Sequence, residues 1–483
     1  MVALLDRVSR ALDPDRGLQL AMSGLIEAQG TRYALGTDRA AWCPGQPLKL
    51  LLAGYVGTRN TGADVRVEEM IRQFRRILGD DQVELTLLTV DPALSAGYFR
   101  AVRQVQLPTV FPKFLYDECP RHHGVVACEG SMFKSKFATA LSTMMAGALG
   151  LAAVEGKLSV GYGAEAGEMV EGLREFVRRQ CKNSFVICRN EPSRRVLEAL
   201  GIRTAGGTDT AWTFEPSARE RGANLLEKAG WDGRSELLAI CPINPFMWPT
   251  KPDVMKFLAL RFAGQYREQH YKSIYFHHDS PEARLQLDAY LGAIAAAVGV
   301  FAKERGVVPV LVGMERLDRK ACALLRERLG FRAPMFVSDE YDMYDLVSVL
   351  RNCSLMVTSR YHAMVTSMPG LVASAGITMD ERIHNLLHDR GHPELLLRTG
   401  EEGLGEKLIE TLRRLDRERA RYREEIARFV PTQLRLMGQM GMAFCDEVSR
   451  VYPDFELPAR TRAWPDYLPS LGSSMSGLLE QWG

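Results

Sequence analysis

The sequence lacks the features that mark several specialised classes of protein. Its nine cysteines include no C-x-x-C pair, and their spacing fits neither a zinc ribbon nor a dense disulfide framework. Lysine and arginine total 61 against 59 acidic residues, and no long basic block is present to follow a phosphate backbone. We therefore expect reduced thiols and no nucleic-acid partner.

Long apolar runs are also missing. The two longest, MMAGALGLAAV and LGAIAAAVGVFA, are too short to span a membrane. Asp6, Asp13 and Asp15 interrupt the N-terminal segment where a signal peptide would need an apolar core. These absences predict a cytoplasmic protein with no membrane span.

The composition is that of an ordinary globular protein, with 46% hydrophobic and 25% charged residues. Because single hydrophobic cores stop growing near about 250 to 300 residues, a chain of 483 residues predicts two domains. Apolar runs such as LKLLLAGYV and VELTLLTV alternate with amphipathic ones such as ADVRVEEMIRQFRRIL, which is typical of a parallel sheet with crossover helices.

This alternation predicts where the domains lie. We expect an N-terminal extension over 1–47, an α/β domain over 48–218 and a second α/β domain over 219–400. Helices and a weakly structured tail should occupy 401–483. The expected strands of the second domain are ELLAICPINP, SIYFHH, VVPVLVGM, APMFVS, CSLMVTS and GLVASAG. Ligands of such folds bind at the carboxyl ends of the strands, usually between the domains.

The first candidate loop is GYVGTRNTGAD, between an expected strand and an expected helix. Its amides and the helix dipole could face an anion at Gly62, and Asn60 and Asp64 could orient the hydroxyls of a sugar. A tight turn in which Asn60 or Asp64 caps the helix explains the same residues without any ligand. Both interpretations stay open.

The stretch ACEGSMFKSK repeats this arrangement. Gly130 and Ser131 follow an apolar strand, and a helix is expected to begin near Lys134 and Lys136. These lysines could meet a phosphate or a carboxylate, but solvated lysines in a first helical turn are commoner than ligands.

Two further strand ends carry arginine. Arg189 directly follows SFVIC, so its guanidinium should emerge at a carboxyl end, where a salt bridge to a loop acid is the structural alternative. In CSLMVTSRYHAMVTSMPG, Thr358 or Ser359 should cap a short helix that starts near Arg360 and His362. Arginine offers a planar fork to an anion, and histidine suits proton transfer near neutral pH. Without a ligand, the histidine would be a packing residue and the arginine would be ion-paired. The strand-to-helix junction favours the functional interpretation over this alternative.

Three histidines, His384, His388 and His392, are spaced by four residues in DERIHNLLHDRGH. The first two could share a helix face and bind a metal. Without an H-E-x-x-H motif or a cysteine pair, surface or interface histidines are favoured, and no metal site is expected.

Together these motifs resemble the polysaccharide pyruvyl transferase family over roughly residues 48–390. The segment DLVSVLRNCSLMVTSRYHAMVTSM is similar to the strand, S-R-x-H and short helix of that family, and CRNEPSRRVLEALG is similar to its R-[DN]-x-x-S segment. GGTDTAWTFEP resembles the part of the family that carries an aspartate before the domain crossover, and DERIHNLL resembles a later helix that lines the cleft. The sequence departs from the pattern at RNTGAD, where N-x-G-D is usual, and at CEGS, where a G-G-G-like turn is common. Both departures lie on the acceptor side.

The resemblance implies an α/β fold of two Rossmann-like domains with parallel sheets, of the glycosyltransferase-B type, facing a central cleft. It implies transfer of a pyruvyl group from phosphoenolpyruvate, a small anionic donor, to a hydroxyl of a sugar or glycan, with release of phosphate and without a metal or cofactor. Arg360 and His362 would be catalytic, with Arg360 on the phosphate or carboxylate, Arg189 on the other anionic end and His362 moving protons. The substrate-binding residues would be Arg189, Asn60, Gly62, Asp64, Gly130, Ser131, Asp209, Ser359 and Tyr361.

Two other functions fit the same pattern. A glycosyltransferase of this architecture would bind the diphosphate of a nucleotide sugar through arginine and could use Asp64 as its base. A non-catalytic relative would use the altered N-terminal loops to bind a partner. The oligomeric state stays open.

Overall fold

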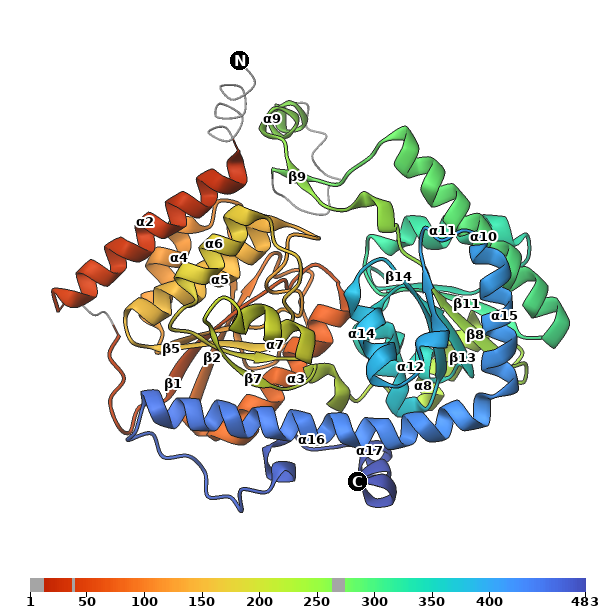
Figure 1. Ribbon diagram of the computed structural model, residues 1–483. Coiled ribbons are helices and arrows are strands. Elements are labelled where there is room, and N and C mark those ends of the chain that lie inside the picture. Colours follow the sequence, from red (N-terminus) through yellow and green to blue (C-terminus); the bar gives the residue numbers. More distant parts are fainter. Residues whose placement is uncertain (1–12, 37–39, 263–273) are drawn as a thin grey trace.

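The computed structural model describes residues 13–36, 40–262 and 274–483, and these form two α/β domains side by side (Figure 1). Each domain is built on a parallel sheet whose central strands are buried on both faces. Strands of this kind read as continuous apolar runs because helices cover both faces of the sheet. The predicted pair of Rossmann-like domains is confirmed.

The first sheet has seven parallel strands in the order β3-β2-β1-β4-β5-β6-β7. The edge strands β3 and β7 were not expected from the sequence, because RQVQ and RTAG are short and partly polar. The strands are β1 Leu48–Ala53, β2 Val83–Thr89, β3 Arg103–Gln106, β4 Gly124–Ala127, β5 Leu158–Ala164, β6 Phe185–Cys188 and β7 Arg203–Gly206.

The helices of the first domain include one that is buried on nearly every side, α5. Helix α2, Pro14–Ala34, packs on it from the N-terminal segment, and Gly147 and Gly150 leave room for Met22 and Ile26. The expected start of α5 near Lys134 and Lys136 is wrong, because residues up to Ala138 form a loop. The helices and 3-10 turns are α3 Thr61–Leu78, η1 Asp80–Gln82, α4 Pro112–Glu118, η2 Cys119–Arg121, α5 Thr139–Val154, α6 Glu171–Gln180, α7 Glu191–Glu198 and η3 Thr210–Thr213.

The second sheet has six parallel strands in the order β12-β11-β8-β13-β14-β15. The prediction of a sheet strand at SIYFHH is wrong: only Tyr275–Phe276 (β10) is extended, and it pairs antiparallel with Lys251–Pro252 (β9), apart from the sheet. Histidines follow this run at once, so it is too short to cross the sheet. The strands of the sheet are β8 Leu237–Cys241, β11 Val308–Gly313, β12 Met335–Val337, β13 Leu355–Thr358, β14 Ala373–Thr378 and β15 Leu396–Arg398.

One helix of the second domain, α10, is long and apolar enough to cross a membrane by length and composition. Half of its most apolar window is buried, and it packs on α11 and α15, as a core helix does. The helices and turns of this domain are α8 Arg219–Lys228, η4 Pro245–Met247, α9 Val254–Phe262, α10 Pro281–Arg305, α11 Asp318–Leu329, α12 Met343–Arg351, α13 Tyr361–Ser367, η6 Met368–Gly370, α14 Glu381–Asp389, η7 Pro393–Leu395 and α15 Leu404–Arg417.

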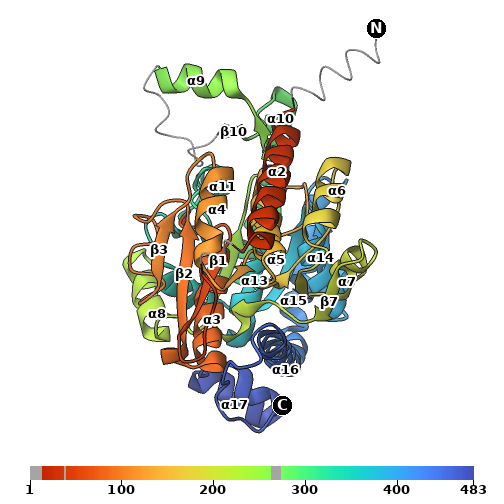
Figure 2. The same cartoon turned by 90° about the vertical axis from the view of Figure 1, so that its left-hand side faces the viewer.

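After the second domain comes a long helix, α16 Arg419–Val451, that runs along both domains (Figure 1). At its start Arg419 pairs with Glu236 of the second domain, and near its end Glu447 pairs with Arg203 of the first. Figure 2 shows α16 end-on, with α17 below it. The prediction of a weakly structured tail is wrong, because η8 Trp464–Tyr467 and α17 Ser473–Trp482 follow, and α17 buries Met475 and Leu478.

The two domains meet at the carboxyl ends of their strands. The amide of Thr61, after β1, donates to the carbonyl of Met314, after β11, at 2.8 Å. The hydroxyl of Ser338, after β12, donates to the carbonyl of Arg59 at 2.6 Å. Loops from both sheets therefore converge where the sequence predicts the ligand site.

Candidate active site

Asp209 is the centre of a buried polar cluster between the domains. It caps η3, and its Oδ1 accepts a hydrogen bond from the amide of Ala211 at 3.0 Å. Its Oδ2 lies 3.2 Å from Nε of Arg66, 3.1 Å from Nη1 of Arg189 and 3.3 Å from Nε2 of His362. Arg66 and Arg189 come from the first domain and His362 from the second. The structure thus brings the predicted residues Arg189, Asp209 and His362 together.

The ionisation of this cluster assigns the tautomer of His362. Burial alone would raise the pKa of Asp209, but Arg66, His362 and Arg189 outweigh it and hold that pKa well below its ordinary value. Burial lowers the pKa of His362, with Arg66 and Arg189 adding to the effect and Asp209 opposing it. At neutral pH the imidazole is therefore uncharged. An ionised carboxylate can only accept hydrogen bonds, so Nε2 of His362 carries the proton that faces Asp209. Nδ1 of His362 is then the basic atom.

Gly62 of α3 lies directly against the ring of His362. A Cβ atom at this position would stand 2.2 Å from Nδ1 of His362, so any larger residue would push the imidazole away. Asn60 caps α3 by accepting from the amide of Ala63 at 3.3 Å, so Asn60 fulfils the capping alternative. Helix α3 therefore meets the histidine of the other domain with its first turn.

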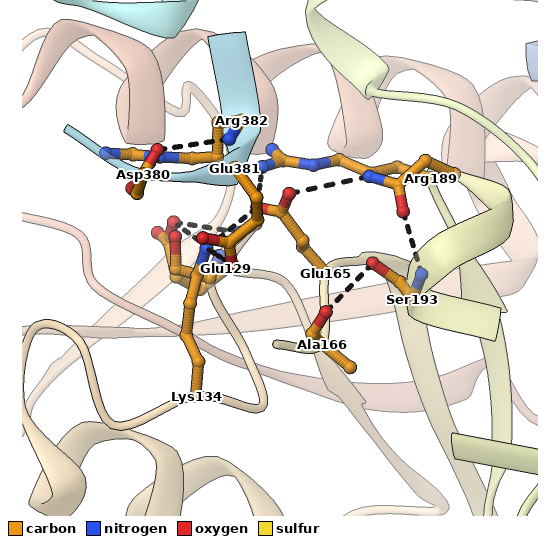
Figure 3. A network of polar contacts seen from close by, with 12 residues as sticks. Glu129, Lys134, Glu165, Ala166, Arg189, Ser193, Asp380, Glu381 and Arg382 are labelled. Atoms are coloured by element: carbon orange, nitrogen blue, oxygen red, sulfur yellow. Dashed lines mark hydrogen bonds and ion pairs between the residues drawn. The ribbon is translucent and has the colours of Figure 1, made fainter. Parts of the chain in front are cut away.

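A second group of charges lies around Glu165 (Figure 3), and Arg189 joins it to Asp209. Glu165 directly follows β5 and accepts from Nη2 of Arg189 and, at 3.0 Å, from Nζ of Lys134. Burial would raise the pKa of Glu165, but Arg189 and Lys134 outweigh it and lower that pKa. Nζ of Lys134 also donates to Oε1 of Glu381, on α14 of the second domain, at 2.9 Å. Lys134, for which solvation was the favoured expectation, is 2% exposed.

The CEGS loop forms one wall of this cluster. A Cβ atom on Gly130 would stand 2.6 Å from Nη1 of Arg189 and 2.8 Å from Nη1 of Arg66, so both guanidinium groups approach the loop backbone. The amides of Gly130 and Ser131 donate to Oε1 of Glu129 at 2.8 and 3.4 Å. The loop therefore already presents its amides to a carboxylate.

Arg360 is not part of the Asp209 cluster. Its Nε donates to Oδ2 of Asp318 at 2.9 Å, its Nη2 donates to Oδ1 of the same carboxylate, and Nη2 lies 2.8 Å from Oε2 of Glu315. Burial raises the pKa of Asp318 to about 6, even though Arg360 opposes this shift. The guanidinium predicted to hold a phosphate is thus bound by two carboxylates of its own domain.

Of the other predicted residues, Tyr361 lies at the Asp209 cluster, whereas Ser359 and Asp64 do not contact it. The ring of Tyr361 lies 4.5 Å from Cζ of Arg189, on the cluster side. Ser359 exchanges a 2.8 Å hydrogen bond with the hydroxyl of Tyr290 on α10 and faces the core of the second domain. Asp64 is buried, and in the described part of the chain its Oδ1 has no hydrogen-bond partner. Burial raises the pKa of Asp64 well above its ordinary value, with Glu315 and Glu129 adding to it.

Three residues of the cluster, Glu165, Arg66 and Glu381, were not site candidates in the sequence, and a fourth, Lys134, was considered but not favoured. Glu165 follows an apolar strand as Arg189 does, so the same signal could have found it. Arg66 lies inside an amphipathic helix, where a charge normally marks the solvated face, and no local signal distinguishes it. Lys134 and Glu381 meet only through the packing of the two domains.

His384 and His388 of α14 and His392 after it do not converge on one point. The rings of His384 and His388 lie 4.2 Å apart, whereas His392 faces Glu394 and Glu425. Over residues 13–36, 40–262 and 274–483, no group of three or more His, Cys, Asp or Glu side chains could hold a metal ion.

Comparison with protein families confirms the resemblance. Residues 151–368 match the family model described as polysaccharide pyruvyl transferase, and this range lies within residues 48–390, over which the sequence shows the resemblance. The matched range includes Glu165, Arg189, Asp209, Arg360 and His362. Among curated proteins, no sequence matches the chain.

Several solved structures are similar to this protein in fold. A protein described as a UDP-N-acetylglucosamine 2-epimerase from Listeria monocytogenes is 12% identical with a TM-score of 0.51, over 83% of this chain and 98% of that one. A UDP-GlcNAc 2-epimerase from Neisseria meningitidis is 10% identical, with a TM-score of 0.46 over 78% and 93% of the chains. A family 9 glycosyl transferase from Veillonella parvula is 11% identical, with a TM-score of 0.40 over 79% and 100%. The fold is glycosyltransferase-B-like, and these likenesses concern the fold alone.

Proposed function

We propose that this protein transfers a pyruvyl group from phosphoenolpyruvate to hydroxyl groups of a sugar or glycan in the cytoplasm, without a metal ion or cofactor. The observation that carries the proposal lies inside the matched family domain. There Arg189 and His362, from different domains, converge on one buried aspartate, Asp209. An arginine and a neutral histidine at facing strand ends suit an anionic substrate that gains and loses protons.

The anionic donor binds between Lys134, Arg189 and Arg66. The fully buried Nη1 of Arg66 has no hydrogen-bond partner in the described part of the chain and lies beside Nη1 of Arg189 along Gly130. A buried N–H without an acceptor is costly, so a ligand oxygen at this place would be stabilised. Glu381, whose side chain is 37% exposed, holds Lys134 from the opposite domain and is the carboxylate that a donor would displace.

The reaction requires a defined flow of protons. The methylene carbon of phosphoenolpyruvate gains a proton and C2 becomes cationic, two acceptor hydroxyls form C–O bonds to C2, and the C2–O bond to phosphate breaks. The two hydroxyl protons end on the methyl group and on the leaving phosphate. Nδ1 of His362 is the basic atom that takes a hydroxyl proton, while Asp209 holds the ring through Nε2 and stabilises the imidazolium.

In this scheme Arg360 positions the helix that carries His362 and does not bind the donor. Its pairs with Asp318 and Glu315 fix the residue before α13, and so fix the start of the helix that carries Tyr361 and His362. A direct contact with the donor would require Arg360 to leave two buried carboxylates, which is unfavourable.

A thermal-shift screen tests the donor, with phosphoenolpyruvate compared against phosphate, pyruvate and nucleotide sugars. Stabilisation by phosphoenolpyruvate that is lost in Arg189→Ala supports the proposal. Release of phosphate on adding a sugar acceptor completes the test. Stabilisation by nucleotide sugars alone would instead assign a glycosyltransferase, and no response to any small anion would favour a partner-binding protein.

A further inference from the structure

An apolar pocket adjoins the charged cluster on the acceptor side. It has a volume of about 440 Å³, within the range of small-molecule sites. Its walls are the loops after β1, β2 and β3, the start of α5 and the β9–β10 pair of the second domain. The side chains that line it are mostly apolar or aromatic and include Tyr55, Leu107, Phe111, Phe137, Leu141 and Met144.

Phe137 forms the boundary between this pocket and the cluster. Its ring lies 4.6 Å from Cζ of Arg382 and 5.7 Å from Nζ of Lys134. Its carbonyl accepts hydrogen bonds from the amide and hydroxyl of Thr250, at 2.9 and 3.0 Å, so the second domain holds this wall. Tyr55 makes a similar link, because its hydroxyl donates to Glu315 at 3.4 Å. A ligand in the pocket therefore touches the residues that border the cationic site.

We infer that the pocket binds an apolar aglycone of the acceptor, so that the substrate is a sugar joined to a hydrocarbon group rather than a free sugar or a plain polysaccharide. The inference rests on the proposed function for the sugar end. A sugar ring needs several hydrogen-bond partners, whereas this lining offers mainly carbon surface. The hydrocarbon lies in the pocket and the sugar extends past Phe137 towards His362.

The helix beyond the pocket favours a long hydrocarbon. Helix α9 follows β9, whose neighbour Thr250 lines the pocket, and it projects from the molecule (Figure 2). It exposes Met255 and Phe262 by 77% and 88%, and Leu258 by 39%. The segment that leads away from the pocket wall therefore exposes further apolar side chains, which a hydrocarbon longer than the pocket could contact.

The test measures binding of methyl, phenyl, octyl and dodecyl β-D-galactosides, each below its micelle concentration, by calorimetry with the full chain. We expect the affinity for the octyl glycoside to be at least about a hundredfold higher than the affinity for the methyl glycoside, whose binding should not be detected. The reason is that each buried methylene raises the affinity by up to about fourfold. A further gain with dodecyl identifies a lipid chain, and phenyl equal to dodecyl identifies an aryl-sized group. Equal binding of methyl and octyl glycosides, or no binding of any, overturns the inference.

Variants locate the binding. Leu107→Gln and Leu141→Gln make the lining polar at partly exposed positions, and each should weaken octyl glycoside binding at least tenfold. Leu324→Gln, at a partly buried position of α11 outside the pocket, is the matched control and should bind as the wild type does. Unchanged binding in both pocket variants would refute the site. Thermal stabilisation by phosphoenolpyruvate is measured in parallel, so loss of the proposed donor and loss of the aglycone site are distinguished.

Discussion

Substituting Asp209 by asparagine should destabilise the protein strongly. The side chain of Asp209 is fully buried, and one of its oxygens faces Arg66, Arg189 and His362. Asparagine keeps the shape but removes the charge, so two guanidinium groups lose a buried counter-ion. Removing one partner of a buried ion pair typically costs about 3–5 kcal/mol. We expect a loss of that size in the free energy of unfolding.

Urea unfolding followed by tryptophan fluorescence measures the loss, and Trp212 lies three residues from the substitution. The control is Asp279→Asn, which removes a pair with Arg284 in which both side chains are largely exposed, and it should leave the midpoint unchanged. Because the pKa of Asp209 is lowered on folding, its contribution is complete above the ordinary carboxyl pKa and is lost as pH falls through the folded value. The difference between the variant and the wild type should therefore be constant between about pH 6 and 8. A loss below about 1 kcal/mol would refute the view that Asp209 balances both arginines.

Three further predictions concern the ligand site. Arg189→Lys should weaken phosphoenolpyruvate binding about tenfold or more, because a point charge lacks the planar fork, whereas Arg195→Lys at an exposed position should not; calorimetry measures both. Glu381→Gln should tighten donor binding by roughly two- to fivefold, since it removes the carboxylate that competes for Lys134, and weaker binding would contradict this role. His362→Ala should lower turnover by about a hundred- to ten-thousandfold. In the wild type the acid limb of kcat/KM should have its midpoint below 6.5, because the pKa of His362 is lowered and its neutral form persists there; a midpoint above 6.5 argues against His362 as the base.

The sequence predicted the parts of the fold that local patterns encode. Continuous apolar runs marked the central strands, and residues placed directly after such runs, Arg189 among them, reached the site. The partners of Arg360 could not be predicted, because Glu315 and Asp318 lie more than forty positions earlier and meet it only in the folded sheet. Arg66 was missed for a similar reason, since a buried arginine inside an amphipathic helix has the same local pattern as a solvated one.

Helix α16 limits how the cluster can open to a ligand. In the described part of the chain, the segment after η3 and helix α16 both run from one domain to the other, and the ends of α16 pair with Glu236 and with Arg203. A body attached at two separate points keeps one easy motion, rotation about the line through those points, while sliding and twisting are opposed. Separation of Lys134 from Glu381 and of Gly62 from His362 would then follow a single coordinate. Donor access and the release of the His362 ring would be geometrically the same event.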